Sequence, residues 1–243
     1  MIWLAGVILA FMAVPFLVGP VLVLMQQRLP ARYRFEKRES RTFLAEQTPT
    51  FLALHHALLQ KGFNPAGASV LQMRHVKTDF SLYLDEQAGV ICTLSTAASS
   101  LGVSTQAEFT QMYSDGSLVN VNNHPVINVY PRNPRREAYR FPELNDLDAL
   151  LAAAMKIFAA RGSGRQVSRY PLDEVWLAME VWLDAELDAL IAGGYVSETV
   201  QDGQRRLTVK GAILMTWKLC WPVKPVLARI DRASARQALA RAG

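Results

Sequence analysis

The amino-acid sequence predicts an α+β fold with an N-terminal transmembrane helix, an antiparallel sheet domain with flanking helices, and a small α/β unit at the C-terminal end. Three observations predict this arrangement. Residues 1–27 carry no charged side chain. Residues 68–130 contain several runs rich in β-branched and aromatic side chains, which are typical of strands. Residues 172–192 space their apolar side chains as a helix does, and two short strand-like runs follow.

The apolar run at 1–27 predicts a transmembrane anchor. About 20 apolar residues in a helix span the hydrocarbon layer of a bilayer, and this run is longer. It lacks the basic segment and the small-residue cleavage site of a secretory signal peptide, so a retained helix is preferred to a cleaved leader.

A basic segment follows at 28–42 and supplies most of the net charge of +5. Because positive flanks stay on the cytoplasmic side, we expect a single-pass protein of the plasma (inner) membrane, with its N-terminus outside and its remaining domains in the cytoplasm. The basic side chains are candidates for contact with anionic lipid headgroups. They are Arg28, Arg32, Arg34, Lys37, Arg38 and Arg41.

Residues 43–161 are predicted to form the α+β domain. A helix is expected from Pro49, a residue suited to a first helical turn, with Thr48 or Thr50 as its cap. Five or six antiparallel strands are expected next, because the runs lie too close together for crossover helices. Asp115-Gly116 predicts a tight hairpin within them. A helix capped by Asn145 or Asp146 ends the domain.

A short linker at 162–168 leads to a second unit at 169–243. Within it, "LIAGGYVSE", "QDGQ" and "RRLTVKGAIL" form a helix end, a turn and a returning strand before another helix. Residues 189–214 thereby resemble the wing and last helix of winged-helix domains. The resemblance implies a winged-helix-like unit in which Arg205 and Arg206 are wing contacts. The wider layout resembles bacterial membrane-anchored proteins of unassigned function, which implies no activity.

Charge argues against DNA binding by this unit. In DNA-binding members of the winged-helix class, the helix before the wing enters the major groove. Here that helix carries six acidic side chains and no basic one, which opposes approach to phosphates. The acids are Asp173, Glu174, Glu180, Asp184, Glu186 and Asp188. Nucleic acid is therefore not expected as a partner.

The sequence shows no motif of a nucleotide-binding or hydrolytic enzyme, and its two cysteines lack metal-site spacing. No catalytic residue, cofactor or metal ligand is predicted. The polar run "NVNNHP" makes Asn122, Asn123 and His124 a candidate ligand or partner loop. The alternative is a turn whose Asn side chains bond their own backbone.

Trp217 and Trp221 stand four residues apart in a stretch that also holds Lys218 and Lys224. They could belong to an interfacial segment on a lipid surface. The preferred interpretation is that both fill the core of the second unit, because so small a unit needs large apolar side chains.

The sequence therefore predicts a non-enzymatic adaptor, regulator or accessory protein that holds an unknown protein partner at the membrane. Two alternatives stay open. One is a membrane-tethered winged-helix transcription regulator, and the other is an enzyme with an unrecognised site. The oligomeric state is left open as well.

Overall fold

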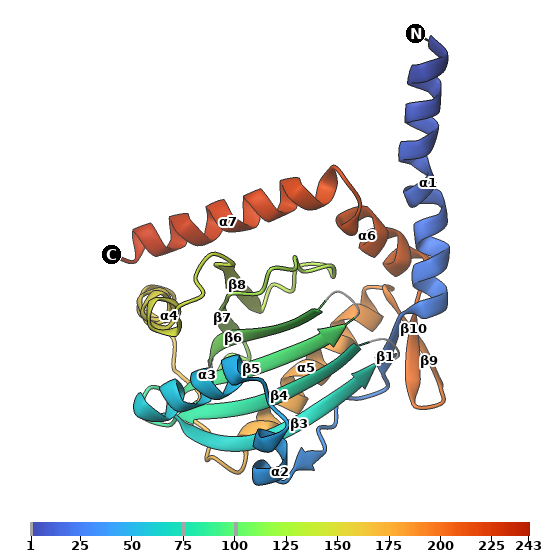
Figure 1. The fold of residues 1–243 in the computed structure, drawn as a ribbon. Coiled ribbons are helices and arrows are strands. Elements are labelled where there is room, and N and C mark those ends of the chain that lie inside the picture. The colour runs from blue at the N-terminus through green and yellow to red at the C-terminus, as the bar shows by residue number, and fades with distance from the viewer. Residues whose placement is uncertain (1, 74–75, 100–101) are drawn as a thin grey trace. The chain divides into compact units, whose positions relative to one another are not determined.

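A computed structural model describes residues 2–73, 76–99 and 102–243, with side chains for 14–70, 78–97 and 102–243 (Figure 1). The chain forms two compact units, and each is assembled from separated stretches of sequence. Unit 1 comprises Met1–Tyr33, Val126–Asn133 and Leu183–Ile230. Unit 2 comprises Arg34–Pro125, Pro134–Trp182 and Asp231–Gly243. The boundaries predicted from the sequence instead separate consecutive segments.

Within the described residues, unit 2 is built on a seven-stranded sheet of order β2-β3-β4-β5-β6-β7-β8. The strands are β2 (Lys37–Arg38), β3 (Asn64–Met73), β4 (Val76–Asp85), β5 (Val90–Ser99), β6 (Gly102–Met112), β7 (Leu118–Asn122) and β8 (Arg136–Arg140). Neighbours are antiparallel from β2 to β7. The α+β class is thus confirmed, and the predicted hairpin at Asp115-Gly116 joins β6 to β7, with Gly116 at φ 76°.

The last pair of this sheet departs from the predicted antiparallel arrangement, because β8 runs parallel to β7. A parallel neighbour needs a connection of about a dozen residues that returns the chain to the same end of the sheet. The stretch 123–135 between the two strands is long enough to do this.

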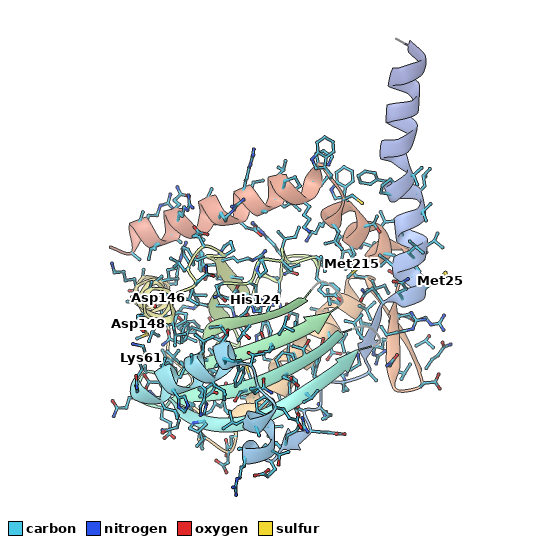
Figure 2. The ribbon with its side chains drawn as sticks, in the orientation of Figure 1. Met25, Lys61, His124, Asp146, Asp148 and Met215 are labelled. Atoms are coloured by element: carbon cyan, nitrogen blue, oxygen red, sulfur yellow. The ribbon has the colours of Figure 1, made fainter. Side chains whose placement is uncertain are left out.

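One face of the sheet carries the larger core of unit 2. Four helices in the described part of the chain contribute to it, and Val119 and Val121 of β7 point into it. The helices are α2 (Ser40–Ala45), α3 (Pro49–Gln60), α4 (Leu147–Arg161) and the end of α7 (Val223–Arg241). The predicted caps of α3 and α4 are confirmed, because the Thr48 hydroxyl accepts from the Phe51 amide at 3.2 Å and the Asp146 carboxylate accepts from the Ala149 amide at 3.0 Å. Lys61 and Asp148, 2.8 Å apart, link α3 to α4 (Figure 2).

The opposite face of the sheet is covered by the beginning of α5 (Val175–Ala192). Trp176 is buried there, and its indole N–H donates to the Ala66 carbonyl at 2.9 Å. The ring of Phe35 lies 5.1 Å from that of Trp176. Residues 34–38, predicted as part of the basic segment 28–42 beside the membrane, are therefore built into unit 2.

Unit 1 contains a three-stranded sheet of order β1-β10-β9 among its described residues. Its strands are β1 (Arg28–Pro30), β9 (Val196–Gln201) and β10 (Gln204–Leu207). The β9–β10 turn at Asp202-Gly203 has positive φ at both residues, as tight hairpins of this kind require. The unit also holds α1 (Ile2–Gln26), α6 (Val209–Leu219) and the start of α7 (Val223–Arg241). Its core gathers Leu29, Leu187, Leu190, Val196, Leu207 and Met215.

The transmembrane anchor predicted at 1–27 is contradicted. In the part of the chain that is described, no helix combines the length and the apolar character needed to cross a membrane. The plasma-membrane, single-pass placement that followed from the anchor is corrected with it.

Candidate interaction surface

Helices α1 and α6 of unit 1 lie against each other at very short range (Figure 1). A Cβ atom placed on Gly19 would come within 2.5 Å of Cγ2 of Thr216, so only glycine fits at that point. The rings of Phe16 and Trp217 stack at a tilt beside it, with centroids 5.7 Å apart. The contact covers one side of each helix and leaves the other side of each uncovered.

The uncovered side of α1 is apolar. Its large side chains are between 47 % and 72 % exposed. They are Val14, Leu17, Val18, Val21, Leu22 and Met25. Figure 2 shows Met25 pointing away from α6, whereas Met215 lies on the inner side of α6 and is buried. These apolar side chains are therefore exposed to water, whereas folding normally buries such side chains.

The outward side of α6 is apolar as well. Val209, Ile213 and Trp217 recur every four residues, and each is more than half exposed. The inward side, with Ala212 and Met215, packs into the unit 1 core. A surface helix of a globular protein places polar side chains on its outer face, so α6 departs from that pattern.

The apolar surface extends along the chain into the start of α7. Trp221, Val226 and Ile230 are all at least half exposed. The expectation that Trp217 and Trp221 fill the core is therefore wrong, since they are 54 % and 66 % exposed. On α6 the buried residues instead include Ala212 and Met215, whereas the Trp217 ring contacts Phe16 of α1 and stays half exposed.

The charges on this stretch have one sign. Residues 209–230 contain four basic side chains and no acidic one. Lys210 donates to the Gly193 carbonyl at 2.8 Å, and Lys218 donates to the carbonyls of Asn128 and Tyr130. Lys224 and Arg229 are exposed on α7. We call the exposed set Val209, Ile213, Trp217, Trp221, Lys224, Val226, Arg229 and Ile230 the α6–α7 surface.

The basic segment predicted for lipid headgroups is largely engaged inside the units. In unit 1, Arg28 donates to the carbonyls of Leu24 and Gln27, and Arg32 pairs with Asp188 at 2.8 Å. In unit 2, Arg34 lies 3.8 Å from Glu180, and Arg38 pairs with Glu46 at 3.0 Å. Lys37 in β2 and Arg41 in α2 are exposed.

The acids of α5 also bind backbone amides. The Tyr33 amide donates to Asp184 at 2.8 Å, and the Phe35 amide donates to Glu180 at 2.7 Å. The carboxylates that were counted against DNA binding thus hold the segment that follows α1. Sequence reasoning missed this role, because some 150 residues separate the partners.

The predicted loop Asn122, Asn123 and His124 lies at the end of β7 in unit 2 (Figure 2). The Asn122 amide donates to Asn120 at 2.6 Å and its oxygen accepts from the His124 backbone at 3.1 Å. Asn123 accepts from the Ala107 amide and donates to the Leu144 carbonyl. Both side-chain amides are therefore used in holding the turn.

His124 lies near one carboxylate and two arginines. Its Nε2 is 3.7 Å from Glu108, which is longer than a hydrogen bond. Burial lowers the pKa of His124, the positive charges of Arg140 and Arg136 lower it further, and Glu108 opposes them. The imidazole is neutral near pH 7 and the geometry does not form an acid–base pair.

The predicted wing contacts behave differently from each other. Arg205 donates to the backbone carbonyls of Ala31, Ser197 and Glu198 and so braces the β1-β10-β9 sheet. Arg206 is exposed and faces Arg28 in the β1–β10 register. Of the two predicted wing contacts, Arg206 is thus the exposed one, and Arg205 is engaged with backbone carbonyls.

Comparisons of this chain with protein-family models, with curated proteins and with solved structures found no match. The resemblance of residues 189–214 to winged-helix domains therefore stays a prediction. The order of α5, β9, β10 and α6 follows that pattern, while the third strand of the sheet, β1, comes from the N-terminal end of the chain.

Proposed function

We propose that the protein is a non-enzymatic adaptor that docks on a partner through the exposed apolar side of unit 1. The observation that carries the proposal is the outward face of α6, where Val209, Ile213 and Trp217 meet water along the whole helix. Exposed apolar patches of this extent mark interaction sites in folded proteins.

The energetics favour an occupant for this surface. Full burial of a large aliphatic side chain is worth about 1.5–3 kcal/mol, so each half-exposed one retains about 1 kcal/mol to gain. The three residues of α6, together with Trp221, Val226 and Ile230, offer several such increments on one unit. The free energy gained by burying these side chains would offset part of the translational and rotational entropy that is lost on association.

An adaptor needs a second contact, and unit 2 offers a smaller one. Leu177 and Val181 stand one helical turn apart on α5, and both are about 60 % exposed. Both lie in the part of α5 that belongs to unit 2. The two surfaces therefore belong to different units of the chain.

The polar loop at 122–124 is not part of the proposed docking surface. Its two asparagine side chains are hydrogen-bonded within the fold, and Asn122 is buried. His124 lies beyond hydrogen-bonding distance of Glu108. The groups that would be expected to act on a substrate are used to close the turn.

Photo-crosslinking tests the proposal. Benzoylphenylalanine placed at Ile213 of the full chain, in its native cells, is expected to form an adduct with whatever covers α6. The same probe at Gln201, an exposed position on β9 of unit 1, is the control and is expected to form none. Equal labelling from both positions, or none from Ile213, would show that α6 has no specific occupant.

A further inference from the structure

Resting on the proposed docking role, we infer that the occupant of the α6–α7 surface is an anionic lipid surface. Trp217 and Trp221 lie at the boundary between headgroups and acyl chains, and Lys224 and Arg229 contact the headgroups. The inference concerns contact with one face of a lipid layer and needs no helix that crosses it.

The two tryptophans carry the first argument. Each is more than half exposed, and they stand one turn apart at the end of α6 and just beyond it. An indole combines a large apolar ring with one polar N–H, which suits the border between acyl chains and water.

The distribution of charge carries the second argument. No acidic residue occurs in 209–230 or in 14–26, the two stretches that supply the exposed apolar side chains of α1, α6 and early α7. Four basic residues lie in the first stretch. A surface with apolar and positive groups alone is complementary to anionic lipid, to which each nearby basic residue adds favourable binding.

Two acids of unit 1 are engaged with the segment that follows α1. Asp188 pairs with Arg32, and Asp184 accepts from the Tyr33 amide, both away from α6 in sequence and in contacts. Lys224 and Arg229 stand exposed beside Val226 and Ile230 on the same two turns of α7. A protein partner would need an acidic, apolar face of its own, and the lipid surface supplies both at once.

Vesicle flotation tests the inference with the full chain diluted from mild detergent. The chain is expected to float with vesicles of phosphatidylcholine and phosphatidylserine and far less with phosphatidylcholine alone. Lys224→Glu with Arg229→Glu is expected to weaken binding to the anionic vesicles at least about tenfold. Trp221→Ser with Val226→Ser is expected to weaken binding to both kinds of vesicle.

The matched control reverses two exposed charges of unit 2, through Lys156→Glu with Arg169→Glu. It changes the net charge equally and is expected to leave flotation unchanged. Equal binding to neutral and anionic vesicles, or equal losses in the two charge-reversed variants, would overturn the inference.

The crosslinking experiment separates this inference from the docking role itself. An adduct at Ile213 that extracts into organic solvent identifies lipid. A protein adduct, or an adduct to a second copy of the chain, together with no flotation, would refute the lipid inference while the docking role stands. No adduct and no flotation would refute both.

Discussion

Gly19 of α1 and Thr216 of α6 are in such close contact that any side chain at position 19 would overlap the threonine methyl group. Thr216 is itself buried, and its hydroxyl has no hydrogen-bond partner among the residues that the structure describes. Thr216 therefore contributes to this contact through the packing of its methyl group and not through a hydrogen bond. The exposed apolar side of unit 1 is held in place by this one close crossing of two helices.

Gly19→Ala is expected to destabilise the full chain by about 1–3 kcal/mol, because overpacking a close contact forces the helices apart. Thr216→Ala removes the opposing methyl group and is expected to have a small effect alone and to restore most of the loss in the double variant. Thermal unfolding of the four proteins measures the coupling. Additive effects of the two changes would contradict the contact.

Glu180 is expected to matter more than its charge partner. Its side chain is only 14 % exposed and accepts from the Phe35 amide, whereas Arg34 is 64 % exposed. Glu180→Ala is expected to reduce the free energy of unfolding by about 1.5–3 kcal/mol, the value of a hydrogen bond to a charged group. Arg34→Ala is expected to reduce it by less than about 1 kcal/mol, as for exposed ion pairs.

Denaturant unfolding of both variants checks this ranking. Glu180→Gln, which keeps an acceptor for the Phe35 amide, is expected to fall between them. If Arg34→Ala were as damaging as Glu180→Ala, the ion pair rather than the backbone hydrogen bond would hold the segment.

Stability is expected to fall on acidification below about pH 6.5. Burial lowers the pKa of His124 in the folded chain, so the unfolded chain binds a proton more readily in that range. The stabilising contribution of neutral His124 is complete above the unfolded pKa and is lost as the pH falls from that value through the lower pKa of the folded chain. His124→Gln is expected to reduce the loss between pH 7 and pH 5 measured by denaturant unfolding.

The variant is not expected to abolish the loss completely. Burial and the neighbouring His56 also lower the pKa of His55, which contributes a change of the same sign. If His124→Gln lost as much stability between pH 7 and pH 5 as the parent chain does, protonation of His124 would not be a cause of that loss.

The two cysteines are expected to react with iodoacetamide at very different rates. Cys92 of β5 is completely buried, and burial raises the pKa of its thiol well above the ordinary value, so little thiolate is present. Cys220 is partly exposed at the end of α6. Mass spectrometry of the folded chain is expected to find the label at Cys220 and to find it at Cys92 only after unfolding.

Several local elements could be predicted because their causes lie within a few residues. Thr48 and Asp146 cap helices through amides three positions ahead, and Asp115-Gly116 forms a turn by its own backbone preference. Such signals require no knowledge of distant partners.

The candidate site could not be predicted in the same way. Trp217 and Trp221 were placed in the core from size and composition, but α1 occupies the inward side of α6 and leaves both indoles exposed. The absence of acids from 209–230 is visible in the sequence and was the available signal. Its meaning emerged only when the exposed side of α6 was known.

The sequence by itself determined the α+β class, most of the strands and helices, and the caps and turns that bound them, because these depend on neighbours along the chain. Only the tertiary structure decided that the arginines after α1 meet the acids of α5, that β1 joins β10, and that the apolar side of α6 faces outward. Those outcomes depend on which distant segments pack together. The spacing of residue types along the chain does not predict which distant segments pack together.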